Sequence, residues 1–219
     1  MISNPFKKQL CDGNLLRMAN DSIENLSTED RSFAPSPEFA AQANAKSTLY
    51  AEAEKDRLAF WEKQADALVW QQKWNTTLEW EVPYAKWFIG GKLNATVSAL
   101  DRHVAEGRGS RTAFHFEGEP GDTRTITYAD LLADVSKAAH ALTSIGIKDG
   151  DRVAIYMPLI PEAVVAMLAC ARIGATHSVV FGGFSAQSLR DRIQDTSAKI
   201  VITADNQMRG GKQLPLKSI

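Results

Sequence analysis

The sequence has few of the residues that mark disulfide-rich, metal-binding or nucleic-acid-binding proteins. Its 219 residues include two cysteines and four histidines, scattered along the chain. They are too few and too far apart for a disulfide framework or a local metal motif. Lys and Arg number 25 against 26 Asp and Glu, and the net charge of -1 leaves no basic surface for nucleic acid. We therefore expect no metal site and no nucleic-acid partner.

Long apolar runs are missing as well. No stretch reaches the roughly 18 uncharged apolar residues that a membrane-spanning helix needs. The first residues, MISNPFKKQLCDGNLL, lack the apolar core and cleavage pattern of a signal peptide. These absences predict a cytoplasmic location and no membrane partner. With 44% hydrophobic residues, the chain has enough apolar material for a globular core.

The amino-terminal part of the sequence changes composition twice. Residues 1–34 are polar with weak hydrophobic periodicity, so we expect a poorly ordered tail. Residues 37–67 are typical of one or two amphipathic helices. All five tryptophans then lie between Trp61 and Trp87. Such rings either stack on bases or sugars or clamp a segment of little regular structure onto a neighbour, and without a basic groove clamping is favoured.

Asp101, Arg102 and His103 follow one another directly, which suggests a general base oriented by the Asp. Adjacent residues of a helix or strand point in different directions, so the three side chains do not converge without a special turn. We favour a helix face or a loop for this run and assign no catalytic residue.

From residue 125 onward, helix and strand patterns alternate. Apolar residues recur at helical spacing over residues 128–145, between a cap at Thr127 and a stop at Gly146. Next we expect a strand at 153–157, a helix at 161–173 that buries the Cys170 thiol, a strand at 178–181, a helix at 185–193 and a strand at 199–203. The strands VAIYM, SVVF and KIVIT are almost continuously apolar. The order predicts an α/β fold, a parallel β-α-β-α-β half-sheet flanked by helices and preceded by a mostly helical and irregular tryptophan-rich extension.

Ligands of open α/β sheets collect at the carboxyl ends of the strands, so the loops there are the candidate site. The loop after Met157 lacks the G-x-G-x-x-G of a dinucleotide-binding enzyme. The next loop holds Gly182 and Gly183, just before a helix that begins near Ser185. These glycines either let a phosphate approach the unpaired N–H groups of the helix or only make a tight turn.

The last loop reads ADNQMRGGK, in which Arg209 and Lys212 flank Gly210 and Gly211. Two cations on a flexible backbone suit phosphate, and the alternative is a solvated surface turn. Together the two glycine loops predict a site for one phosphorylated ligand.

These segments together resemble the acetyl-CoA synthetases, AMP-forming members of the adenylate-forming ligase family, from about residue 35 to the last residue. The resemblance rests on PSPEFAAQAN, WFIGGKLN, LDRH, ITYADL, GDRVAIYMP, ACARIGATHSVVFGGFS, ITAD, RGGK and PLK. The chain departs from the family at Ser98 and Ala99, where these enzymes commonly have Asn-Cys. Propionyl-CoA synthetases share much of the pattern.

The resemblance implies a two-step ligase reaction. Acetate attacks the α-phosphate of ATP, accompanied by Mg²⁺, to form an acyl-adenylate, and the CoA thiol then displaces AMP. In the family an R-G-G-[RK] element contacts CoA, which implies this role for Arg209, Gly210, Gly211 and Lys212, with Gly182 and Gly183 near the same ligand. The ATP and Mg²⁺ sites, the acyl pocket and the catalytic Lys of the family have no counterpart in this sequence.

The resemblance also implies a domain plan, with a tail at 1–34, an acetyl-CoA synthetase-type extension at 35–110 and the start of the AMP-binding adenylation domain at 111–219. Residues 215–219 are expected to open a helix of one turn. We therefore expect an amino-terminal fragment that is inactive without the remainder of the enzyme chain. The alternatives are a propionyl-CoA synthetase and a non-catalytic module that binds CoA or a nucleotide or docks on a partner.

Overall fold

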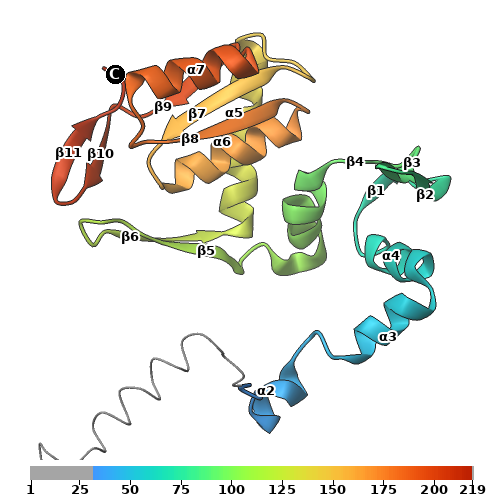
Figure 1. Cartoon of the computed structure of the whole chain (residues 1–219). Coiled ribbons are helices and arrows are strands. Elements are labelled where there is room, and N and C mark those ends of the chain that lie inside the picture. The colour runs from blue at the N-terminus through green and yellow to red at the C-terminus, as the bar shows by residue number, and fades with distance from the viewer. Residues whose placement is uncertain (1–31, 219) are drawn as a thin grey trace, which may run out of the picture. The chain divides into compact units, whose positions relative to one another are not determined.

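The computed structural model describes residues 32–218 (Figure 1). Most of the tail expected at 1–34, including Cys11, lies outside the described residues. The chain divides into two units, Met1–Glu52 and Ala53–Ile219. In the first, α2 (Pro37–Gln42) follows Ser36, whose Oγ accepts a 3.2 Å hydrogen bond from the Phe39 amide. Helix α3 (Thr48–Lys55) runs across the boundary, and neither helix contains a buried residue.

Residues 57–93 combine a helix with more strand than the sequence indicated. Helix α4 (Arg57–Ala65) follows Asp56, whose carboxylate accepts a 2.9 Å hydrogen bond from the Ala59 amide. Strand β2 (Thr76–Glu81) pairs with β3 (Tyr84–Ile89), and β1 (Trp70–Gln72) pairs with β4 (Lys92–Leu93). Helices between residues 37 and 67 are thus confirmed, although three form where the sequence predicted one or two. The tryptophan-rich stretch differs from the expectation, because small antiparallel sheets replace most of its irregular structure.

Three rings of this stretch form a cluster of their own. The centres of the Trp70, Trp74 and Phe88 rings lie 4.9 to 5.7 Å apart. The Trp70 indole also donates a 2.8 Å hydrogen bond to the Ala65 carbonyl, which ties α4 to the rings. Trp80, by contrast, is 58% exposed. Part of the aromatic surface is therefore buried locally, ring against ring.

Two short helical segments, η2 (Val97–Asp101) and η3 (Val104–Arg108), lead to the α/β part of the chain. Here the side chains of Asp101, Arg102 and His103 meet different neighbours. Asp101 accepts hydrogen bonds of 2.8 and 2.9 Å from Arg172, and Arg102 donates to a backbone carbonyl at 2.6 Å. The His103 ring centre lies 4.5 Å from that of Tyr128. This divergence agrees with a structural place for the run.

The ion pair between Asp101 of η2 and Arg172 joins the segment after the tryptophan-rich stretch to the α/β part. The hydrogen bonds from Arg172 hold the pKa of Asp101 below its usual value, against a smaller opposing effect of burial. Asn94 adds to the joint, because its Nδ2 donates a 3.0 Å hydrogen bond to the Arg172 carbonyl. The two segments, more than 70 residues apart in the sequence, are held by polar contacts.

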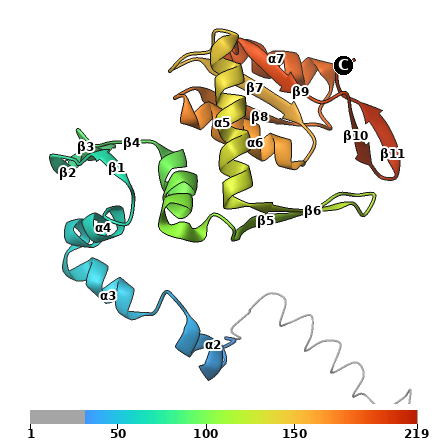
Figure 2. The same ribbon diagram turned by 180° about the vertical axis from the view of Figure 1, so that it is seen from behind.

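An antiparallel hairpin precedes the longest helix. Strand β5 (Thr112–Glu117) pairs with β6 (Thr123–Thr127), which runs directly into α5 (Tyr128–Ser144). Thr127 caps this helix as predicted, since its Oγ accepts a 3.2 Å hydrogen bond from the Asp130 amide. Figure 2 shows the hairpin extending from the amino end of α5. The sequence indicated the turn at 118–122 but not the two strands beside it.

The largest sheet of the described residues has three parallel strands (Figure 1). Strand β7 (Arg152–Met157) lies between β8 (Thr176–Phe181) and β9 (Ile200–Thr203). Helix α6 (Pro161–Arg172) connects β7 to β8, and α7 (Ala186–Thr196) connects β8 to β9. The predicted β-α-β-α-β order is confirmed, with small shifts at the ends of the elements.

The two faces of the sheet are covered by different helices. Val153 and Ile155 pack against α5 and α6 in a cluster that includes the buried Cys170. On the other face, Tyr156 and Val180 pack with Leu189 of α7. Both faces of β7 are therefore buried, which accounts for its continuous apolar sequence. None of the helices within residues 32–218 is long and apolar enough to cross a membrane.

The expectation of a helix opening at Pro215 is wrong. Strand β10 (Asn206–Arg209) pairs with β11 (Lys212–Pro215), and Pro215 is the last residue of β11, opposite Asn206. Gly210 and Gly211 make the turn with φ of 59° and 69°, the left-handed conformation that a tight two-residue hairpin needs. Leu216 then packs beside Tyr156 and is 2% exposed. This tertiary contact outweighs the local preference of Pro for a first helical turn.

Candidate anion-binding site

A cavity of about 530 Å³ lies at the carboxyl end of β7 and β8. Its walls come from the β5–β6 hairpin, the loop after β7, the end of β8 and strand β10. In an open α/β sheet this is the edge at which ligands bind. The β5–β6 and β10–β11 hairpins approach each other beside it (Figure 1). The cavity therefore lies at the sheet edge where the sequence predicted a site, but of the six predicted binding residues only Arg209 lines it. The two hairpins beside it were not indicated by the sequence.

Arg209 joins the two glycine loops. Its guanidinium lies 4.9 Å from the centre of the Phe181 ring, a favourable cation–π distance. It also lies so close to Gly183 that a Cβ at that position would collide with it. The structure thus brings together Gly183 and Arg209, which the sequence assigned to one site. A side chain at 183 would force the guanidinium away.

Gln207 connects the same loops and was missed by the sequence analysis. Its Nε2 donates a hydrogen bond to the Gly182 carbonyl, and the residue is 9% exposed. A Cβ on Gly182 would lie 2.7 Å from the Gln207 Oε1. In a strand, residues two apart share a face, so Gln207 and Arg209 both reach toward the end of β8. Recognising β10 as a strand would have revealed this pair.

Two cations stand directly opposite each other at the end of the β10–β11 hairpin. The register pairs Arg209 with Lys212, and both residues are exposed. Within residues 32–218, neither forms a salt bridge with an acidic side chain. Like charges opposite each other on neighbouring strands are destabilising. An anion bound between them would relieve this repulsion, which favours a phosphate site over a mere solvated turn.

The hairpin turn itself offers a backbone donor. Gly210 and Gly211 have open space where a Cβ would stand, so a ligand can approach the backbone closely. The Gly211 amide donates a 2.7 Å hydrogen bond to the Glu119 carboxylate on the β5–β6 hairpin. The turn therefore already holds a carboxylate oxygen, which shows that its amide can bind an anionic group.

The β5–β6 hairpin is fixed to α6 close to its turn. Arg124 donates hydrogen bonds of 2.7 and 2.9 Å to the Glu162 carboxylate, and these hydrogen bonds lower the pKa of Glu162. The Arg124 guanidinium also lies 5.2 Å from the centre of the Phe116 ring. These contacts hold the hairpin so that its turn reaches the cavity.

The predicted helix start beside the glycines lies at Ser185. Its Oγ accepts a 3.3 Å hydrogen bond from the Ser188 amide and so caps α7. The Tyr156 hydroxyl, on the buried strand β7, donates a 3.3 Å hydrogen bond to the Phe184 carbonyl. The loop that carries the two glycines is therefore attached at both ends, to the sheet and to α7.

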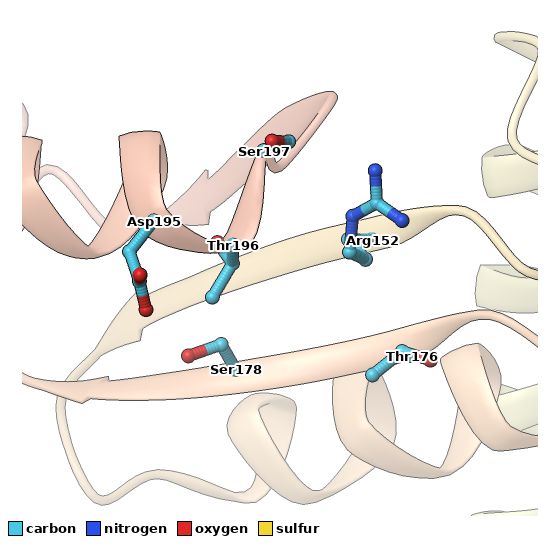
Figure 3. A pocket seen from close by; sticks show the side chains of 6 residues that line it. All are labelled: Arg152, Thr176, Ser178, Asp195, Thr196 and Ser197. Carbon is cyan, nitrogen blue, oxygen red and sulfur yellow. The ribbon is translucent and has the colours of Figure 1, made fainter.

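A second cavity, of about 370 Å³, lies at the opposite end of the sheet (Figure 3). It is bounded by the first residues of β7 and β8 and by the last turn of α7, with Arg152, Ser178 and Asp195 among its lining residues. None of the residues predicted to bind a ligand contributes to it. Its place at the amino ends of the strands makes it the weaker candidate for a ligand site.

The described residues offer no alternative centre of metal or thiol chemistry. Residues 32–218 contain no group of three or more His, Cys, Asp or Glu side chains that could hold a metal ion. Cys170 is fully buried, and burial raises the pKa of its thiol, which makes it unreactive. It is the small buried thiol that the sequence predicted.

Comparison with known proteins gave matches over nearly the whole described part. Residues 101–218 match the family model for AMP-binding enzymes, and residues 47–99 match the model for the acetyl-coenzyme A synthetase N-terminus. The chain is 58% identical over 201 residues to an acetyl-coenzyme A synthetase of Streptomyces avermitilis, covering 91% of the chain and 31% of the relative.

Two further relatives carry the same name. The one from Mycobacterium bovis is 61% identical over 189 residues, which cover 85% of the chain and 29% of that protein. The one from Mycolicibacterium smegmatis is 55% identical over 221 residues, which cover 96% of the chain and 23% of that protein. The matched part thus spans less than a third of each of these relatives.

Proposed function

The chain belongs to the AMP-binding enzyme family, and from this membership we propose that it is the amino-terminal part of an acetate:CoA ligase. The complete enzyme would convert acetate, ATP and CoA to acetyl-CoA, AMP and diphosphate through an acetyl-adenylate. The named relatives support acetate as the substrate. A propionyl-CoA synthetase is the second candidate, because propionyl-CoA synthetases share much of the sequence pattern.

Within this enzyme, the chain would supply part of the CoA site. We assign Arg209, Gly210, Gly211 and Lys212 to a phosphate of CoA, with Gly182 and Gly183 beside them. The observation that carries this assignment is the convergence of Arg209 with the Phe181–Gly183 turn and with Lys212 across the hairpin. Charge-assisted hydrogen bonds from Arg and Lys are the strong contacts of phosphate recognition.

The remaining chemistry would lie elsewhere in the enzyme. We place the ATP and Mg²⁺ sites and the acyl pocket in the part of the relatives that this chain does not match. In the same proposal, residues 35–110 are an extension of the acetyl-CoA synthetase type and residues 111–219 begin the adenylation domain. The protein would be cytoplasmic and would need no nucleic-acid or membrane partner.

The first test is acetate-dependent release of AMP from ATP, with and without CoA, by the complete protein and by the 219-residue chain side by side. We expect activity in the complete protein alone. Activity of the short chain would contradict our placement of the ATP chemistry. If neither protein released AMP, the result would favour a non-catalytic module that binds CoA or a nucleotide.

The CoA assignment has its own test in the complete protein. Arg209→Ala combined with Lys212→Ala should weaken CoA binding much more than binding of ATP or acetate, since each lost charge-assisted contact is worth about 1.5 to 3 kcal/mol. Arg190→Ala is the matched control, because Arg190 is an exposed cation of α7 outside the cavity. Equal losses for all three substrates would indicate misfolding instead.

A further inference from the structure

The β5–β6 hairpin sends one carboxylate to the turn of the β10–β11 hairpin. Glu119 and Gly211 are 92 residues apart in the sequence, and the Gly211 amide donates a 2.7 Å hydrogen bond to the Glu119 Oε1. Both residues are exposed. Figures 1 and 2 show the β5–β6 hairpin extending from the amino end of α5 toward the β10–β11 hairpin. An acidic group therefore occupies a donor of the candidate anion site.

The Glu119 carboxylate lies where a phosphate oxygen of a bound ligand would accept a hydrogen bond. Gly211 lies between Arg209 and Lys212, the two cations that face each other across the hairpin. A carboxylate at the Gly211 amide partly offsets their repulsion and accepts a charge-assisted hydrogen bond, as a phosphate oxygen would. Within residues 32–218, Glu119 forms no salt bridge, and its carboxylate accepts this hydrogen bond from the Gly211 amide.

We propose that Glu119 is a built-in competitor at the CoA site, occupying the Gly211 amide until a CoA phosphate displaces it. The proposal rests on the proposed function. A phosphate that approaches Arg209 and Lys212 meets the negative charge of Glu119, so the two anions exclude each other. The contact is exposed to solvent, where such hydrogen bonds contribute little net stability, and it is therefore easily broken.

The construction of the β5–β6 hairpin suits such an exchange. Close to the turn, Arg124 of β6 is held by Glu162 of α6, whereas Glu119 lies in the turn itself, between the strands. Gly121 in this turn has a φ of 91°, and a Cβ there would meet open space. Glu119 is exposed, so its side chain can turn away from the Gly211 amide while the strands stay paired and Arg124 stays bound to Glu162. Glu119 would also keep weakly bound monoanions, acetate among them, away from the cations.

The test compares CoA dissociation constants by titration calorimetry in the complete protein. Glu119→Gln and Glu119→Ala should each bind CoA more tightly, by about three- to tenfold, the effect of one partly screened charge close to an anion. Glu117→Gln is the matched control, since it removes a charge from the same cavity wall but not from the Gly211 amide. Its gain should be smaller than that of Glu119→Gln.

The direction of the change in CoA affinity shows whether Glu119 competes with CoA or only supports the hairpin. If Glu119 merely held the hairpin in shape, both variants would bind CoA more weakly, and this result or an unchanged affinity would overturn the proposal. The gain of Glu119→Gln should also shrink as ionic strength rises, because screening weakens the repulsion. Equal melting temperatures of the variants would exclude a folding defect.

Arg209→Ala separates this proposal from the proposed function. If Arg209→Ala leaves CoA affinity unchanged, the CoA assignment itself fails. If Arg209→Ala weakens CoA binding while Glu119→Gln does not strengthen it, the CoA assignment stands and the competitor role fails.

Discussion

The parallel sheet and the β10–β11 hairpin beside it are held by different forces. Side chains at 153–156, in the middle of β7, are no more than 1% exposed and pack against helices on both faces. In β10 only Gln207 is buried, and the hairpin meets its surroundings through Gln207, Arg209 and the Gly211 amide. Burial stabilises the first region, and polar contacts position the second.

This difference separates stability from binding. Apolar burial gives the larger contribution to folding, whereas exposed polar contacts contribute little net free energy. Substitutions in the sheet should therefore lower stability without a specific effect on CoA. Substitutions at the hairpin and its glycine partners should instead weaken CoA binding and change stability little.

The largest effect on stability is expected from the centre of the sheet. Val153→Ala removes two methyl groups at a position that is 0% exposed, and should lower the free energy of unfolding by about 2 to 3 kcal/mol. Val179→Ala is the matched control, because Val179 lies on the neighbouring strand and the same face but is 53% exposed. Denaturant unfolding of the complete protein measures both. An equal loss at Val179 would mean that another part of that protein covers the edge of β8.

The ion pair between η2 and the end of α6 should give a smaller, pH-dependent effect on stability. Asp101→Asn weakens the bidentate pair with Arg172 and should cost about 1 to 2 kcal/mol near neutral pH, since both side chains are partly buried. Folding lowers the pKa of Asp101 from its usual 3.8, so its contribution is present above that value and is lost as the pH falls through the lower folded pKa. Unfolding of both proteins from pH 7 to pH 3 measures the difference. If Asp101→Asn lowered the free energy of unfolding equally at pH 7 and pH 3, the loss would not come from the ion pair of the Asp101 carboxylate.

The sequence predicted the sheet because its signals are local. Burial within a single element is indicated by apolar runs such as VAIYM and KIVIT and by the 3.6-residue period over 128–145. The hairpins lack such signals. Strands β10 and β11 are four residues each and mostly exposed, so NQMR and KQLP show no apolar alternation. Pro215 illustrates the consequence, because the burial of Leu216 against Tyr156 decides its conformation from outside the segment.

The candidate site was predictable in part for the same reason. Glycine pairs and cations are visible in the sequence, and their place after strands indicated one shared site. The contacts that unite them are not visible. Gln207 acts through the strand geometry of β10, and Glu119 reaches Gly211 across 92 residues. A local sequence pattern cannot predict a contact between residues so far apart in the chain.

The smallest effect on stability should accompany a clear effect on binding. Gly183→Ala places a Cβ where the Arg209 guanidinium now lies and 2.9 Å from the Phe181 ring, so both exposed side chains must move. We expect a change in unfolding free energy below about 1 kcal/mol, because the displaced groups are exposed. CoA affinity should nevertheless fall about fivefold or more, as expected when a charge-assisted phosphate contact is misplaced. Titration calorimetry and denaturant unfolding of the same preparation measure the two quantities.

Gly109→Ala is the matched control for this prediction. Its added Cβ would meet only ordinary contacts of 3.5 Å or more, outside the cavity. If Gly183→Ala retained full CoA affinity, the place of Arg209 against the glycine turn would not matter for binding. If it instead unfolded the protein, the hairpin would belong to the stabilising core, and the separation between sheet and hairpin would fail.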